Sequence, residues 1–167
     1  LSILFTLIVT GASAIIGSIA GAIQGYFGGR TDLIFQRVIE IWSALPFLYV
    51  VILIGSIYGR SFTVLIFVMS LFSWIGLSYY MRGEFLKMRN QTYVRVARAL
   101  GMSTTRIFYK QILPNALTPV ITLLPFSLIG GISSLTALDF LGFGLPPPTP
   151  SWGELLSQGL DVVREHP

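Results

Sequence analysis

The chain has 167 residues, of which 53% are hydrophobic and 11% are charged, and its mean hydropathy is +0.76. These values are typical of a membrane protein and exclude an ordinary soluble domain. The lack of cysteine excludes disulfides and thiolate metal sites, and the single histidine, His166, leaves few ligands for a metalloenzyme. An isoelectric point of about 9.7 would fit nucleic-acid binding only on a soluble basic surface, whereas these cations lie between apolar runs.

An apolar run without charged residues opens the chain and predicts a first membrane span over about 1–27. Gly17, Gly21 and Gly25 share one helix face, so another helix can approach closely there. We favour packing within one bundle over a dimer contact. The run has neither the basic start nor the A-x-A cleavage step of a signal peptide, so we expect an internal segment of a longer protein.

The polar stretch 28–37 predicts a short turn in which Thr31 or Asp32 caps the next helix. The second predicted span covers about 38–58. It carries Glu40 near its start and Pro46 inside, and a proline there should kink or break the helix. After a turn at 59–61, a third span is predicted over about 62–81, ending in an aromatic cluster suited to a membrane interface.

The fourth span is predicted over about 112–138. Pro119, Pro125 and the pair Gly130-Gly131 predict a bent, partly broken helix there. Residues 139–167 contain too many prolines and glycines to cross a membrane, so we expect an ordered outer loop. Within it, Ser151 and Glu154 predict a capping box at the start of a short helix.

The distribution of cations predicts the orientation of these spans. With four spans, the segments 28–37 and 82–111 lie on one side of the membrane and carry nine of the eleven Lys and Arg residues. The other side carries Arg60 and Arg164. By the positive-inside rule, the segments 28–37 and 82–111 are predicted to be cytoplasmic.

The basic segment 82–111 has its own helical pattern. Val94, Ala97 and the Leu100-Gly101 step recur on one predicted helix face, and Arg95 and Arg98 lie on another. Gly101 predicts a helix stop, after which Ser103 caps a second helix that runs to Pro114. Such a pair of helices could act as a lever on the fourth span, or it could be a topogenic loop whose arginines meet anionic lipid.

Residues 93–115, YVRVARALGMSTTRIFYKQILPN, resemble the cytoplasmic EAA loop of ABC-importer permease subunits. Ala97, Gly101, Leu113 and Pro114 match its pattern, whereas Arg95 stands where a glutamate is usual. The stretches GYFGGRTDLIFQRVIEIWSALP (25–46) and LDFLGFGLPPPTPSWGELLSQG (138–159) resemble segments of the peptide-transporting branch. The chain is therefore similar over essentially its whole length to permeases of dipeptide, oligopeptide and microcin C-type uptake systems.

This resemblance implies an all-α, type I ABC-importer permease fold with six membrane helices, of which about four are present. One span would precede Leu1 and another would follow Pro167. The resemblance implies a single transmembrane domain over 1–167 in the bacterial inner membrane. It also implies a homologous permease, cytosolic ATPase subunits and an external solute-binding protein as partners, with peptides or peptide-like solutes as cargo.

The chain has no G-x-x-x-x-G-K-[ST] loop, so ATP and Mg are expected on the ATPase and no cofactor or metal on this chain. The pore subunit is thus expected not to be an enzyme. The resemblance and the periodicity together nominate residues for three roles. These are ATPase coupling (Val94, Ala97, Arg98, Leu100, Gly101), a structural hinge (Ser103, Pro114, Asn115) and the outer loop (Asp139, Pro147, Pro150, Trp152, Gly153).

Two acidic residues support a competing hypothesis, a proton-coupled secondary transporter or channel. Glu40 lies three residues after Arg37, so an ion pair is the favoured interpretation over a proton relay. Asp139 either caps the outer loop, which we favour, or faces the entrance and meets the amino terminus of a peptide. A membrane enzyme is disfavoured because the spans offer no Ser-His or metal-ligand constellation.

Overall fold

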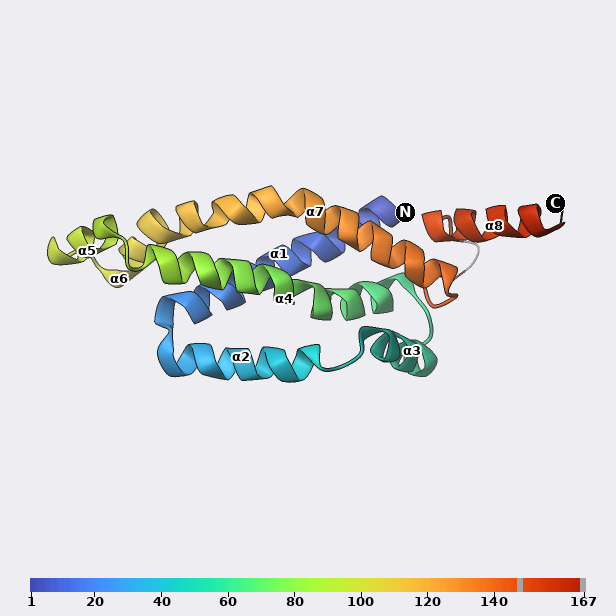
Figure 1. Ribbon diagram of the computed structural model, residues 1–167, viewed down its shortest axis with the longest axis horizontal. Coiled ribbons are helices and arrows are strands. Elements are labelled where there is room, and N and C mark those ends of the chain that lie inside the picture. Colours follow the sequence, from blue (N-terminus) through green and yellow to red (C-terminus); the bar gives the residue numbers. More distant parts are fainter. Residues whose placement is uncertain (147–148, 166–167) are drawn as a thin grey trace. The chain divides into compact units, whose positions relative to one another are not determined.

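The computed structural model describes residues 1–146 and 149–165. All regular structure in these ranges is helical, which confirms the predicted all-α class (Figure 1). The elements, in chain order, are α1 (Ser2–Phe27), α2 (Gly29–Ser43), α3 (Phe47–Tyr58), α4 (Phe62–Met88), α5 (Thr92–Ala99), α6 (Thr104–Ile107), the π-helical turn η1 (Phe108–Ile112), α7 (Leu113–Phe140) and α8 (Trp152–Glu165).

Three helical stretches are long and apolar enough to cross a membrane: Ser2–Phe27, Phe62–Met88 and Thr104–Phe140. The pair α2 and α3 meets the same test only when taken together, and its two helices are bent by 71°. Pro46 is the N-cap residue of α3 and fixes the break. The predicted break is confirmed, and the span predicted over 38–58 therefore consists of two helices.

The start of α2 differs from the prediction. Gly28, at φ 63°, separates α1 from α2, so residues 29–37 are helical rather than a turn. Thr31 and Asp32 lie inside α2, and no side chain caps this helix. The predicted cap is wrong because two successive glycines with positive φ, Gly28 and Gly29, turn the chain here.

Two long helices also exceed their predicted ranges. α4 continues to Met88, so the first part of the basic segment is a helical extension of that span. α7 runs without interruption through Pro119 and Pro125, and the predicted partial break is wrong. A proline removes only one helical donor, and in an apolar helix the remaining bonds and side-chain oxygens can preserve the winding.

The residues form two compact units. Unit 1 comprises Leu1–Gly11, Leu45–Phe72 and Phe126–Pro167; unit 2 comprises Ala12–Ala44 and Ser73–Pro125. The buried core of unit 1 combines side chains of α1, α3, α4 and α7, among them Phe5, Val51 and Leu135. The rings of Phe5 and Phe62 pack edge to face in it, with centroids 5.5 Å apart.

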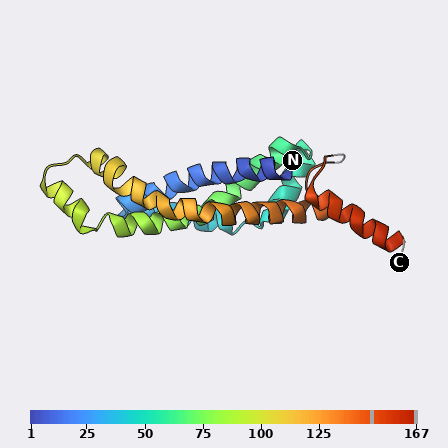
Figure 2. The ribbon, with the colours of Figure 1, turned by 90° about the horizontal axis from the view of Figure 1, so that it is seen from above.

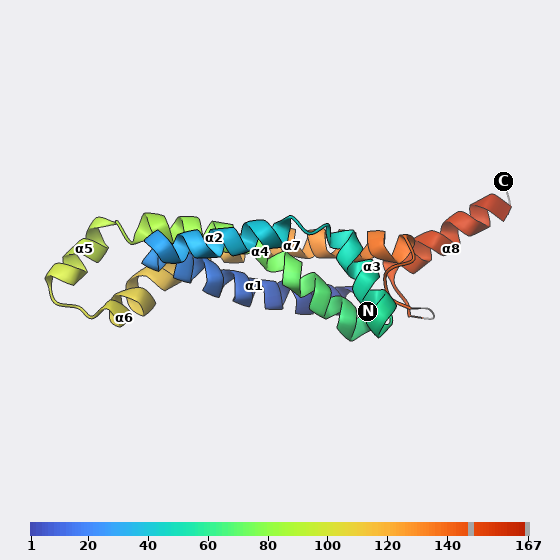
Figure 3. The same cartoon turned by 90° about the horizontal axis from the view of Figure 1, so that it is seen from below.

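Unit 2 is organised around the close contact of α1 with α4. A Cβ atom placed on Gly17 would lie 2.6 Å from the carbonyl oxygen of Trp74, and Gly21 and Gly25 face the next two turns of α4 in the same way. The predicted glycine face therefore packs within one chain. The core beside it contains Met81 and Phe85 of α4. Figures 2 and 3 show α5 and α6 as a linked pair at one end of this unit.

Replacing Gly17 with alanine should destabilise the protein, because the new methyl group would meet the Trp74 carbonyl at 2.6 Å and Leu77 Cβ at 2.9 Å. Overpacking of this kind costs about 1–3 kcal/mol. Gly11→Ala in the same helix is the control, since no described atom lies within 4 Å of its Cβ position. That variant should be neutral or slightly stabilising. The unfolding midpoint of the full-length protein in detergent distinguishes them, and equal midpoints would contradict the α1–α4 contact.

Candidate functional site

The nominated coupling residues lie on different sides of α5. Val94 (0% exposed) and Ala97 (6%) face the core of unit 2, where they join Met81 and Phe85 of α4. Leu100 is 81% exposed, although the sequence pattern placed it on the same face as Val94 and Ala97. The buried face of α5 is therefore narrower than the pattern predicted, and Leu100, the C-cap residue, lies outside it. One face of α5 is thus packed against the core of unit 2, and the other face is exposed.

Gly101 ends α5 as predicted. Its φ is 77°, its N–H donates to the carbonyl of Arg98 at 2.9 Å, and the N–H of Met102 donates to the carbonyl of Ala97 at 3.0 Å. These two bonds form a Schellman motif, which needs a residue in the left-handed region at its turning point. Met102 then packs against the core of unit 2. The turn between α5 and α6 is therefore fixed by backbone bonds and by an apolar contact.

Ser103 occupies the N-cap position of α6, but its hydroxyl makes no capping hydrogen bond. The predicted side-chain cap is therefore wrong. The backbone alone adopts the cap conformation, with φ −63° and ψ 147°, and the carbonyl of Ser103 accepts from the N–H of Ile107 at 3.0 Å. Ser103 thus marks the start of the second helix without holding it through its side chain.

A π-helical turn connects α6 to α7 immediately before Pro114. The N–H of Leu113 donates to the carbonyl of Phe108, five residues earlier. Pro114 has no N–H to offer the carbonyl of Lys110, so the α-helical bond at this position cannot form. Asn115 Nδ2 reaches back to the carbonyl of Gln111 at 2.8 Å. Pro114 and Asn115, nominated for a hinge, therefore directly follow the irregular turn.

The π-helical turn sets which side chains of this segment enter the core. Ile107 and Ile112 are five residues apart and both fully buried, which an i to i+5 turn permits. Between them, the ring of Phe108 meets the rings of Tyr26 and Phe85, each at a centroid distance of 5.3 Å. The segment that leads into α7 is thereby attached to α1 and α4.

A charged pair that the sequence did not suggest links α2 to α4. Arg82 Nε and Nη2 donate to the two carboxylate oxygens of Asp32 at 2.5 and 2.6 Å. Their side chains are 30% and 14% exposed, so the pair is partly shielded from solvent. The signal available in the sequence was an acid at the end of one apolar run and an arginine at the end of another. Nothing local indicated that they meet, since they lie fifty residues apart.

A buried amide network supports the same end of the unit. Gln24, fully buried in α1, donates to Ser78 Oγ of α4 at 2.8 Å and accepts from Gln36 Nε2 of α2 at 2.8 Å. Nearby, Arg89 Nη1 donates to the carbonyl of Tyr26 at 3.3 Å, near the C-terminal end of α1. A glutamine within an apolar run was the sequence signal, because an amide in a membrane helix needs partners. These contacts hold α1, α2 and α4 together beside the basic segment.

Glu40 and Arg37 form the ion pair predicted from their spacing. Arg37 Nη1 donates to Glu40 Oε2 at 2.5 Å, and the side chains of Arg37 and Glu40 are 73% and 53% exposed. Glu40 is therefore a surface carboxylate with a cation beside it. This environment gives no particular support to a buried proton relay.

In unit 1, Asp139 caps the outer loop as favoured from the sequence. Its Oδ1 accepts from the N–H of Leu145 at 2.7 Å. Gly144 and Gly153 lie so close to Asp139 that a Cβ atom on either would overlap it. Gly142, at φ 77°, completes a second Schellman motif at the end of α7, and Arg60 donates to its carbonyl. The interaction of Asp139 with the loop leaves its predicted alternative, contact with a peptide, without support.

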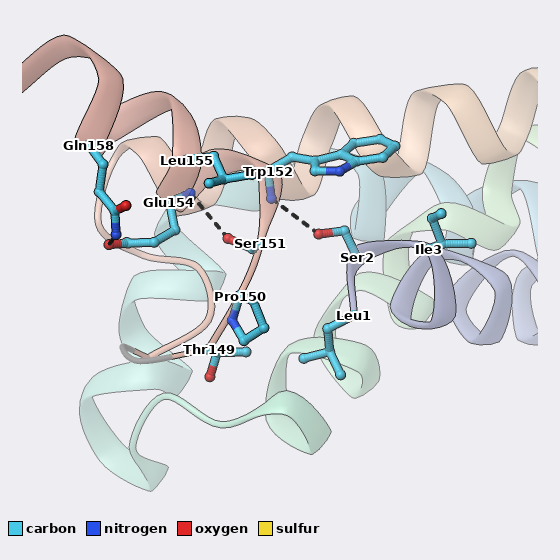
Figure 4. A pocket seen from close by; sticks show the side chains of 10 residues that line it. All are labelled: Leu1, Ser2, Ile3, Thr149, Pro150, Ser151, Trp152, Glu154, Leu155 and Gln158. Carbon is cyan, nitrogen blue, oxygen red and sulfur yellow. Dashed lines mark hydrogen bonds between the residues drawn. The ribbon is translucent and has the colours of Figure 1, made fainter.

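A cavity of about 550 Å³ lies between the first residues of α1 and the start of α8 (Figure 4). Pro150 and Trp152 line it, and the backbone N–H of Trp152 donates to Ser2 Oγ at 3.4 Å. Ser151 Oγ accepts from the N–H of Glu154 at 3.2 Å, which is one half of the predicted capping box. The Glu154 carboxylate instead accepts from Gln158 at 2.8 Å. Pro147 lies outside the described residues.

The structure described so far has long apolar helices, a polar cluster at one end of unit 2 and a basic two-helix segment next to that cluster. These features define a multi-span membrane protein. The chain belongs to the family of binding-protein-dependent transport system inner membrane components, whose model matches residues 13–163. It is 54% identical to the peptidoglycan transport system permease protein YejE of Agrobacterium fabrum, over 98% of this chain and 43% of that protein.

Two further relatives place the chain among peptide-type ABC permeases, as the resemblance predicted. Identity is 48% with the inner membrane ABC transporter permease protein YejE of Escherichia coli, over 98% of this chain and 48% of that protein. It is 35% with the oligopeptide transport system permease protein OppC of Bacillus subtilis, over 92% of this chain and 50% of that protein. The chain thus spans about half the length of the curated relatives it matches. The inner-membrane location is confirmed, and the single-domain and site assignments stay predictions.

Double-mutant cycles should show that the Asp32–Arg82 pair stabilises the protein more than the exposed Arg37–Glu40 pair does. Replacing Asp32 or Arg82 with alanine should each lower the free energy of unfolding by about 1–3 kcal/mol, because each leaves a partly buried charge without its partner. The double variant should then cost less than the sum. The exposed pair Arg37 and Glu40 is the control and should show a coupling below about 0.5 kcal/mol. Denaturation of the full-length protein in mixed micelles measures both couplings, and equal values would contradict this assignment.

Proposed function

We propose that this chain forms part of the pore of an importer for peptides or peptide-like solutes, and that a separate ATPase drives it by pulling on residues 93–113. One observation carries the proposal. α5 is fastened to unit 2 through Val94 and Ala97, while its other side, including Leu100, is exposed. A short helix with one side packed in the core and the other side exposed is suited to transmit the displacement of a docked partner.

The path of that displacement follows the contacts of unit 2. Movement of α5 reaches α6 through the Schellman turn at Gly101, and it reaches α7 through η1. Phe108, packed between Tyr26 and Phe85, engages α1 and α4 in the same movement. Because packed interfaces have discrete arrangements, a small shift of α5 can favour one state of the pore over another. A difference of a few kcal/mol between states suffices to shift the population.

The assembly that we propose follows from the family and from the charge pattern. The segments 28–37 and 82–111 face the cytosol, where the ATPase subunits bind ATP and Mg, so this chain needs no cofactor. A homologous permease completes the pore. An external solute-binding protein delivers the cargo to the opposite side, where Asp139, Gly153 and the cavity beside Trp152 shape the surface. The relatives named for peptidoglycan and oligopeptide transport support a peptide-like cargo.

Replacing Gly101 with valine should uncouple ATP hydrolysis from uptake while leaving membrane insertion intact. A β-branched residue is strained at φ 77°, so the turn that connects α5 to α6 would change. Gly29→Val is the control, because Gly29 also has a positive φ, 54°, but lies outside the proposed path. Uptake and ATPase activity of the reconstituted full complex give the readout. Normal transport by the Gly101 variant would count against the lever.

The source of energy can be tested independently of residues 93–113. Uptake by cells should continue when a protonophore collapses the proton gradient and should stop when ATP is depleted. Glu40→Gln should leave uptake unchanged, because Glu40 is an exposed partner of Arg37. Uptake that fails with the protonophore while ATP is maintained would instead support a proton-coupled transporter.

A further inference from the structure

Three arginines of unit 2 have partners for their side chains. Arg82 and Arg37 pair with carboxylates, and Arg89 donates to a backbone carbonyl. Within the ranges that the structure describes, the guanidinium groups of Arg95 and Arg98 of α5 have no hydrogen-bond or ion-pair partner. Both are exposed, and residues 93–113 contain no acidic residue that could pair with them. Two positive charges on one short helix are therefore available to another molecule.

The exposed surface of α5 has three parallel strips. Tyr93, Val96 and Leu100 follow one another at the spacing of a helix face and form an apolar strip. Arg95 and Arg98, three residues apart, form a basic strip on the other flank. Small residues, Thr92 and Ala99, lie between the two strips. A partner can therefore approach the middle closely while it meets an apolar flank and a charged flank.

The position of α5 favours a protein over a lipid surface as the occupant. In Figures 1 and 3, α5 lies beyond the level at which α1 ends and α2 begins, and this arrangement is internal to unit 2. Arg30 is an exposed cation in the first turn of α2, where that helix begins. Lipid headgroups would meet Arg30 before they meet α5. The basic strip of α5 is thus positioned to contact a protein outside the membrane.

We infer that the groove receiving α5 carries acidic side chains opposite Arg95 and Arg98, so that charge complementarity selects the ATPase subunit that this permease accepts. The inference rests on the proposed function, since it describes the partner of the same docking helix. The glutamate that is usual at this position of the EAA pattern would pair with a cation in the groove. An arginine at position 95 reverses that requirement, because like charges placed opposite one another disfavour a wrong partner.

Binding of the cognate ATPase to the full-length permease pair in nanodiscs of zwitterionic lipid tests this inference. The variant carrying Arg95→Gln and Arg98→Gln should raise the Kd about tenfold at roughly 0.05 M salt, with the difference shrinking at roughly 0.5 M. Arg95→Lys with Arg98→Lys should stay near the wild type, because the charge is kept. Arg30→Gln, which removes one cation at the membrane boundary, should have no effect. Leu100→Asp should abolish binding whether or not the groove is acidic.

The outcomes separate the inference from the proposed function. If Leu100→Asp abolishes binding but the Arg→Gln variant retains the wild-type Kd at every salt concentration, docking holds and the acidic groove is wrong. If none of the variants changes binding, the proposed docking itself fails. If the loss appears only when anionic phosphatidylglycerol is present, and Arg30→Gln shares it, the arginines bind lipid and the inference is overturned. Recovery of Arg98→Glu binding by an acid-to-lysine change in the groove would identify the pair.

Discussion

The contact of α1 with α4 along Gly17, Gly21 and Gly25 controls the geometry of unit 2. Where no side chain separates two helices, their backbones come within van der Waals contact, and dispersion and polar contacts act over the whole length. The polar contacts between α1 and α4 need that spacing. Gln24 reaches Ser78 and Arg89 reaches the end of α1 only because α4 passes directly beside the glycine face.

The same contact forms the surface on which the basic segment rests. Met81 and Phe85 are buried where α4 passes α1, and Val94, Ala97 and Ile107 complete the cluster. The basic segment is therefore an extension of the helix bundle rather than a loose loop between two spans. Apolar burial holds one side of α5 and leaves the other side exposed.

Local features of the sequence were predicted well because their causes are local. Gly101 ends α5 and Pro46 breaks the helix between α2 and α3, since positive φ and a missing N–H act within a few residues. Predictions that depended on the packing around a residue were wrong in two cases. α7 remains continuous at Pro119 and Pro125, and Ser103 does not use its hydroxyl. The irregular winding appears instead just before Pro114, where the core requires both Ile107 and Ile112.

The sequence by itself determined the all-helical membrane class, the family, the concentration of cations on two segments and the turns at glycine and proline. The tertiary structure alone decided which face of α5 is buried, which acid pairs with Arg82 and where the π-helical turn lies. The physical reason is the distance along the chain between the residues that interact. Hydropathy and backbone restrictions can be read from neighbouring residues, whereas α5 has two apolar strips of similar spacing. Only the position of α4, fixed by glycines some sixty residues earlier in the chain, distinguishes them.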